Sequence, residues 1–184
     1  SLGKIPAAAR SLLQISDLNS QLSDPSAQVA IVEMAAASGL ALLAPDDRDP
    51  WQTTTFGTGE LVRLAAERGA AAILVGVGGS ATHDLGLGAL AALGFEFVSA
   101  RGESVVPPLP ARWCDIAHLA GRITPNLPPI RIACDVTNPL LGSRGAAATY
   151  GPQKGLRPAD LPRLDDESAR LALLLCAHCQ QPAA

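Results

Sequence analysis

The sequence predicts an α/β domain with a largely parallel sheet and flanking helices. Ala71–Val77 is an uninterrupted apolar run, which is typical of a parallel strand that is covered on both faces. This run leads through a glycine turn into a helical segment and another strand, which indicates a β-α-β unit. Hydrophobic residues make up 48% and charged residues 17% of the 184-residue chain, so it can bury a core of its own.

Strands and helices are expected to alternate along the chain. In order, we expect a strand over Val29–Met34, a helix over Ala35–Leu43, a helix over Thr58–Gly69, a strand over Ala71–Val77, a helix over Leu85–Leu93, a strand over Phe95–Val98, a strand over Ile130–Asp135 and a helix over Pro158–Cys179. The first helix ends at Gly39 or before Pro45. In the second, Thr58 is the expected N-cap and Gly69 the C-terminal glycine. Prolines predict loops over residues 99–128, and the strand that follows is expected to be buried.

The chain is expected to form one domain over residues 29–184, preceded by a poorly defined segment over residues 1–28. Within that segment, Ala7–Leu13 favours a short helix and Ser23–Ser26 a turn. The spacing of the four cysteines suggests no disulfide framework, so a reducing cytoplasmic location is expected.

The charge balance argues against a polyanionic partner. Lys and Arg number 14 and Asp and Glu 17, which gives a net charge of −3 and no basic field to hold nucleic acid. Aromatic residues are 3%, too few for the stacking platforms of single-strand binders. No apolar stretch approaches the roughly 20 residues that span a bilayer. We therefore expect neither a nucleic-acid nor a membrane partner.

The glycine turn after the central strand is the first candidate site. Gly78 and Gly79 let backbone N–H groups approach an anion without a Cβ in the way, and the following helix adds its positive end. Ser80 and Thr82 supply hydroxyl donors, and Asp84 could hold a metal or a substrate hydroxyl. The alternative is that the glycines serve tight packing and that Asp84 caps a helix. The turn is neither a Walker A loop nor a dinucleotide fingerprint.

Two further clusters follow the last expected strand. Asp135 lies at its carboxyl end, where open α/β sheets bind ligands, and Asn138 follows in a turn. The alternative is that both side chains stabilise that turn. Arg144, Gln153 and Lys154 bracket a short helical segment of small residues, and their two cations and amide fit a carboxylate or a polyphosphate. The alternative is solvated surface cations, and Lys154→Ala is expected to leave stability almost unchanged.

Two weaker candidates contain histidine. Cys176, His178 and Cys179 have the spacing of half a zinc site, but no second pair completes it, so no structural metal site is expected. His83 lies inside the glycine motif, where it contributes to the site or caps the helix that follows.

Three segments closely resemble the bacterial-type glycerate 2-kinases. They are IVEMAAASGLALLAPDDRDPWQTTTFGTGEL, GVGGSATHDLGLGALAALGFEF and ACDVTNPLLGSRGAAATYGPQKG, and the resemblance covers roughly residues 29–179. It implies phosphorylation of D-glycerate with ATP and a divalent metal, taken as Mg²⁺. It also implies a fold like the inserted middle domain of a two-domain α/β enzyme.

The sequence departs from the family pattern in two respects. Ala81–Gly86 reads ATHDLG, where much of the family has Asn followed by Asp-Gly-Gly. The N-terminal Asp-Ser-Phe-Lys-Gly-Ser and C-terminal Thr-Gly-Glu-Gly-Arg segments of the family are both absent. The chain is therefore expected to be a partial copy, the central portion, which alone turns over poorly.

These observations lead to two hypotheses of different classes. In the first, the chain is a glycerate kinase in which Gly78, Gly79 and Ser80 cradle an anionic group. Asp135 acts through a contact with Mg²⁺ or a hydroxyl, and Arg144 and Lys154 offset anionic charge. In the second, it is a catalytically incomplete domain that binds a small anion or serves as an assembly surface. The sequence does not decide which loop binds glycerate and which binds ATP. It also leaves open whether the protein forms a homo-oligomer.

Overall fold

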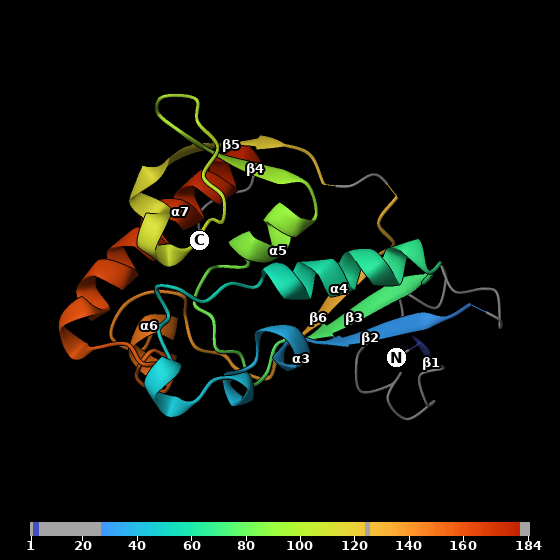
Figure 1. The fold of residues 1–184 in the computed structure, drawn as a ribbon, viewed down its shortest axis with the longest axis horizontal. Coiled ribbons are helices and arrows are strands. Elements are labelled where there is room, and N and C mark those ends of the chain that lie inside the picture. Colours follow the sequence, from blue (N-terminus) through green and yellow to red (C-terminus); the bar gives the residue numbers. More distant parts are fainter. Residues whose placement is uncertain (1, 4–26, 124–125, 181–184) are drawn as a thin grey trace.

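The fold is built on a parallel three-stranded sheet with helices packed against it (Figure 1). The structure is a computed structural model and describes residues 2–3, 27–123 and 126–180. The helix expected over Ala7–Leu13 and the turn over Ser23–Ser26 lie outside the described residues. The predicted α/β class is confirmed.

The strands and helices have the following bounds. The strands are β1 (Leu2–Gly3), β2 (Val29–Glu33), β3 (Ala72–Gly76), β4 (Phe95–Ser99), β5 (Ile116–Gly121) and β6 (Ile130–Ala133). The helices are α3 (Ala35–Ser38), α4 (Phe56–Glu67), α5 (Leu87–Ala92), α6 (Ala146–Tyr150) and α7 (Leu161–His178). Most lie within a few residues of the predicted elements, and α3 ends at Gly39 rather than before Pro45.

The main sheet has the order β1-β2-β3-β6, in which β2, β3 and β6 are parallel and β1 is antiparallel to β2. Helix α4 covers one face of this sheet (Figure 1). Its Val62 and Ala65 join Ile73 and Val75 of β3 in a buried cluster. Because Glu33 pairs with Gly76, and Gly76 with Ala133, the three parallel strands end at the same edge.

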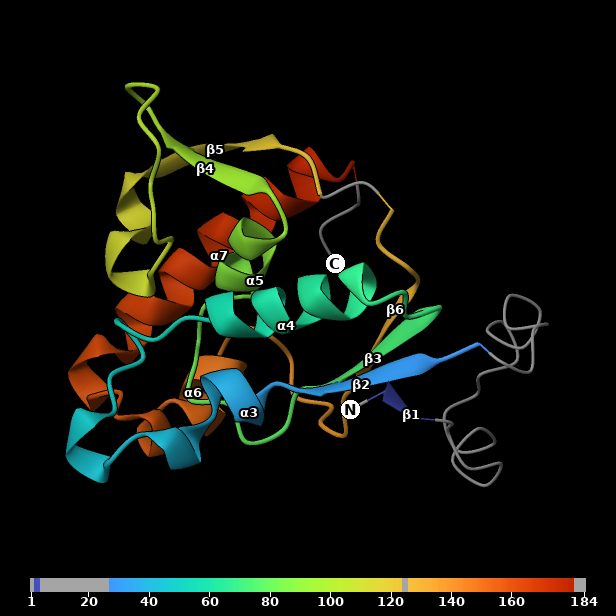
Figure 2. The same ribbon diagram turned by 45° about the vertical axis from the view of Figure 1, so that its right-hand side comes forward.

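A second layer lies beyond α4. Strands β4 and β5 form a separate antiparallel pair, and Figure 2 shows them beside α7, with α5 between this layer and α4. The β-α-β unit predicted from Ala71–Val98 is therefore wrong, because β4 does not join the sheet of β3. The buried Phe97 packs instead with Trp113 and Leu164, in a core cluster that the main sheet does not share.

Three other predictions need correction. Residues 99–128, expected to be loops, contain β5. Helix α4 begins at Phe56, so Thr58 is not the N-cap of this helix. The buried hydroxyl of Thr58 instead lies 2.9 Å from the hydroxyl of Ser38. Strand β6 is not buried: Ile132 is 59% exposed, and β6 is one of the two edge strands of the described sheet. The C-terminal glycine of α4 is confirmed, since Gly69 has φ +77°.

The described part of the chain contains no helix with the length and apolar character needed to cross a membrane.

Candidate functional site

A cavity of about 660 Å³ opens where the three parallel strands end. Met34 follows β2, Val77–Ser80 follow β3, and Cys134–Val136 follow β6, and all of them line it. The opposite wall comes from His83 and neighbouring residues and from the segment that contains α6. The carboxyl edge of a parallel sheet is the usual ligand site of α/β folds.

The glycine loop presents unpaired backbone donors to this cavity. The N–H groups of Gly78, Gly79 and Ser80 form no hydrogen bond with any described residue. The flanking amides are used, because Val77 N–H donates to Ala133 O and Ala81 N–H to Ser38 O. Gly79 has φ +68°, a conformation that favours glycine. Consecutive free amides of this kind suit an anion.

The expected contribution of a helix dipole to this loop is wrong. Helix α5 begins only at Leu87, after a further loop, and not at the glycine turn. The positive potential at this wall therefore comes from the backbone amides and from the Lys154 ammonium, which contacts Ser80 Oγ.

Asp84 is buried and its two carboxylate oxygens are both occupied. Oδ2 accepts hydrogen bonds from Thr55 N at 2.7 Å, Thr55 Oγ1 at 2.8 Å and Gly88 N at 3.2 Å. Oδ1 accepts one from Gly86 N at 3.2 Å. Asp84 is not the N-cap of α5, which is Gly86, but it accepts hydrogen bonds from the backbone at the start of α5 and joins it to Thr55, the residue before α4. Its contact with a metal or a substrate stays a prediction.

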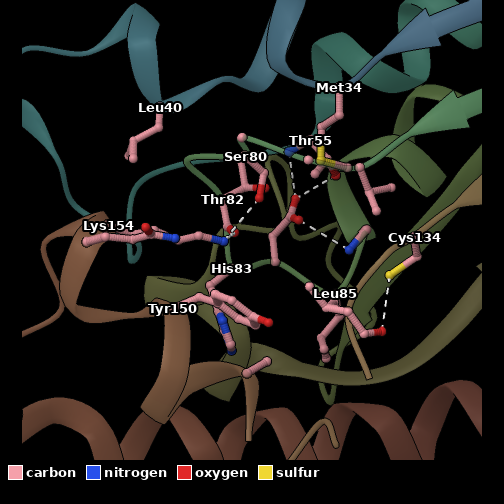
Figure 3. Close-up of a pocket in the computed structure, with 18 of the residues that line it drawn as sticks. Met34, Leu40, Thr55, Ser80, Thr82, His83, Leu85, Cys134, Tyr150 and Lys154 are labelled. Carbon is pink, nitrogen blue, oxygen red and sulfur yellow. Dashed lines mark hydrogen bonds between the residues drawn. The ribbon is translucent and has the colours of Figure 1, made fainter. Parts of the chain in front are cut away.

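Lys154 is the buried cation of the cavity. It ends a short 3₁₀ turn, Pro152–Lys154, before Gly155 with φ +90°. The side chain crosses the cavity (Figure 3), and Nζ donates to Ser80 Oγ at 3.1 Å and to Thr82 O at 2.5 Å. Only 8% of the residue is exposed, so the interpretation as a solvated surface cation is wrong.

Burial also changes the acidity of this ammonium group. Desolvation lowers the pKa of Lys154, and the negative charge of Asp84 opposes that change in part. An ammonium group has three N–H donors, and two are used here. The third has no partner among the described residues.

The other predicted residues divide into two groups. Thr82, Asp135 and Gln153 line the cavity. Of these, Asp135 is exposed to solvent. Asn138 and Arg144 do not line it. The side chain of Arg144 is exposed and stays outside the cavity, although its backbone carbonyl contacts Asn138.

Asn138 matches the interpretation as a turn residue. Its Nδ2 donates to Arg144 O at 3.1 Å, and its Oδ1 accepts a 2.7 Å hydrogen bond from the hydroxyl of Tyr150. Tyr150 itself lines the cavity, so Asn138 contacts a residue of the cavity wall without lining it.

Thr55 and Tyr150 are among the residues of the site that had not been singled out from the sequence. Thr55 holds Asp84, and Tyr150 forms part of the wall. Nothing in the TTT run at residues 53–55 indicates that Thr55 has a partner 29 positions away. Tyr150 could have been found from the sequence, because aromatic residues are rare in this chain. His83 is not a cap, because its Nε2 lies 3.2 Å from Ser168 Oγ.

Metal ligands are sparse in the described ranges 2–3, 27–123 and 126–180. They contain no group of three or more His, Cys, Asp or Glu residues that could hold a metal ion. Cys176 and Cys179 are free thiols.

Comparisons with known proteins agree with the geometry. A profile of the glycerate kinase family matches residues 14–184. Over 158 residues the chain is 40% identical to the glycerate kinase of Haemophilus influenzae, covering 83% of this chain and 41% of that protein. Over 151 residues it is 44% identical to the glycerate 2-kinase of Escherichia coli K12, covering 79% and 39%.

A solved structure gives the same result. A crystal structure from Salmonella typhimurium LT2, of a protein provisionally named glycerate kinase 2, superposes with a TM-score of 0.74 at 42% identity. The match covers 81% of this chain and 40% of that one. The chain thus spans about 40% of the length of the relatives it matches. With most of its length matched, the chain belongs to the glycerate kinase family.

Proposed function

We propose that this chain supplies a binding wall of an enzyme that transfers the γ-phosphoryl group of ATP to D-glycerate. One observation carries the proposal. The unpaired amides of Gly78, Gly79 and Ser80 line the same cavity as the buried ammonium of Lys154. Both reactants are anions, and phosphoryl transfer depends on positioning and charge neutralisation rather than on covalent chemistry. Family membership supports the same reaction.

The chemical roles follow from which donors are free. The three amides and the remaining N–H of Lys154 can bind a phosphate or a carboxylate without first breaking a protein hydrogen bond. Donors held in place before the reaction stabilise charge that develops in the transition state. Lys154 is fixed by Ser80 and Thr82, so its charge is directed before any ligand arrives.

Asp135 is the residue that would hold Mg²⁺. Mg²⁺ at nucleotide sites is usually bound by one or two carboxylates together with phosphates and waters. Asp84 and Asp135 are the carboxylates on the cavity wall, and the oxygens of Asp84 are occupied. The exposed Asp135 therefore fits a metal carried in by ATP, which would neutralise phosphate charge there. Such a metal would not need a preformed set of several protein ligands.

A partial copy remains part of the proposal. Because the chain spans about 40% of the length of its relatives, we propose that residues outside it complete the active site. The second candidate, an incomplete domain that binds a small anion, is favoured by the fact that one wall is already formed. We also propose a cytoplasmic location, which the four free cysteines support.

The test combines binding and turnover. ADP release would be measured with ATP, Mg²⁺ and D-glycerate, and affinity for D-glycerate and inorganic phosphate by calorimetry. A Cβ at Gly78 meets no atom within 4 Å, so Gly78→Val should fold and yet obstruct the amides. We expect it to weaken anion binding by about 10-fold or more. Unchanged affinity in the folded variant would exclude the cradle, and anion binding without ADP release would favour the incomplete domain.

A further inference from the structure

Ser168 determines which nitrogen of His83 carries the proton. The hydroxyl of Ser168, on α7, donates its one hydrogen to Leu164 O at 2.7 Å. It can therefore only accept from His83 Nε2, which lies 3.2 Å away. Nε2 must carry a hydrogen, and in a neutral imidazole this leaves Nδ1 as an acceptor with a free lone pair.

Nδ1 is unpaired and belongs to a residue of the cavity wall. No described residue forms a hydrogen bond with it. Among described residues, Arg48 Nε is the side-chain nitrogen or oxygen that is both fully buried and without a hydrogen-bond partner. His83 Nδ1 also lacks a partner, so it must be accessible to solvent in part. His83 lines the cavity beside Lys154 and Tyr150 (Figure 3).

The neutral charge state of the His83 imidazole allows Nδ1 to act as an acceptor. Burial, followed by the positive charge of Lys154, lowers the pKa of His83 to about 4, and the carboxylate of Asp165 on α7 opposes that change. Asp165 is itself engaged, since both its oxygens accept from Gly142 N. The imidazole is therefore neutral near pH 7.

Most other polar groups on the wall donate or are occupied. The amides of the glycine loop and the ammonium of Lys154 are donors. Asp84 accepts four hydrogen bonds and Ser80 Oγ accepts from Lys154, whereas the exposed Asp135 keeps free acceptors at the strand ends. A hydroxy acid needs donors for its carboxylate but an acceptor for each hydroxyl hydrogen. His83 lines the cavity, and its Nδ1 is such an acceptor.

We infer that His83 Nδ1 accepts a hydrogen bond from a hydroxyl group of the hydroxy-acid substrate, held in that tautomer by Ser168. The inference rests on the proposed function, and it makes His83 a specificity-determining residue. A site built to pair with a hydroxyl rejects acids that lack one, because the acceptor then loses its partner.

The tautomer can be tested without turnover. Long-range ¹⁵N–¹H NMR on the full 184-residue chain reports protonation at each ring nitrogen, and His83→Gln assigns the signal among the three histidines. We expect Nδ1 to be unprotonated at pH 7 and to shift towards a hydrogen-bonded value when D-glycerate is added. A protonated Nδ1 would overturn the inference.

Two variants separate the functions of the two nitrogens. His83→Gln can keep an N–H for Ser168 but places no acceptor at Nδ1. His83→Asn can place an amide oxygen there but does not reach Ser168. Affinities for D-glycerate and for propionate, which lacks both hydroxyls, would be compared by calorimetry. We expect His83→Gln to lower glycerate affinity about 10-fold while propionate affinity stays the same. His83→Asn should retain more of the glycerate preference.

The outcomes distinguish the inference from the proposal on which it rests. If the folded His83→Gln variant keeps the glycerate-to-propionate ratio, His83 does not contact the hydroxyl, and the proposed function stands. Equal losses for both acids would show a structural role and overturn the inference as well. If the wild-type chain binds neither acid, the proposed function fails and the inference with it.

Discussion

The two walls of the cavity differ in how their polar groups are used. At the strand-end wall, the amides of Gly78–Ser80 are unpaired and Asp135 is exposed. At the opposite wall, Asp84 and Lys154 are buried and hydrogen-bonded to neighbouring residues. The first wall has unused capacity to bind a ligand, whereas the second uses most of its capacity to hold the cavity together.

Burial explains the difference. A polar group removed from water must find a protein partner, and leaving it unpaired costs about 1–3 kcal/mol. Substitutions at the buried wall should therefore change stability first. Substitutions at the strand-end wall should change binding first.

Asp84→Ala should have the largest effect on stability. It leaves Thr55 and the amides of Gly86 and Gly88 without their acceptor inside the protein. We expect the free energy of unfolding to fall by about 4 kcal/mol. Urea denaturation measures it, and Asp135→Ala is the matched control on the exposed wall. Equal losses for the two variants would contradict the difference between the walls.

His83 should make stability depend on pH. Its pKa is about 4 in the folded chain against 6.5 for the free side chain. As pH falls from 6.5 towards 4, the unfolded chain takes up a proton that the folded chain refuses, so stability is lost. The loss approaches about 3 kcal/mol and is absent from His83→Gln. Denaturation of both proteins from pH 7 to pH 4 tests this, and parallel curves would contradict it.

Lys154→Ala should cost about 2 kcal/mol, because Thr82 O and Ser80 Oγ lose their buried donor. This replaces the sequence-based expectation of almost no change. Arg144→Ala removes an exposed cation and should stay within about 0.5 kcal/mol. Thermal melts of the two variants compare them directly. If both lose the same amount, the burial of Lys154 has no energetic consequence.

The sequence predicted the elements whose signal is local. The apolar run of β3 and the glycines after it placed the strand-end wall, because continuous apolar residues and strand ends can be read over a few positions. The amphipathic α7 and the short α6 were found for the same reason.

Long-range partners could not be predicted. Strand β4 looked like a neighbour of β3, but its pairing with β5 crosses a proline-rich loop. The burial of Lys154 depends on Ser80 and Thr82, more than seventy residues earlier in the chain. The resemblance to a family located the site residues, yet it did not show which of them are saturated and which are free.

Asp135→Asn should have the smallest effect on stability and a clear effect on binding. Asp135 is exposed and no described residue forms a hydrogen bond or ion pair with it, so the free energy of unfolding should change by less than about 0.5 kcal/mol. If it meets the metal carried by ATP, losing its charge should weaken Mg²⁺-ATP about 10-fold and leave metal-free ATP unaffected. Calorimetry with and without Mg²⁺ separates the two. Equal weakening of both forms would mean that Asp135 contacts the nucleotide itself, and no weakening would remove it from the site.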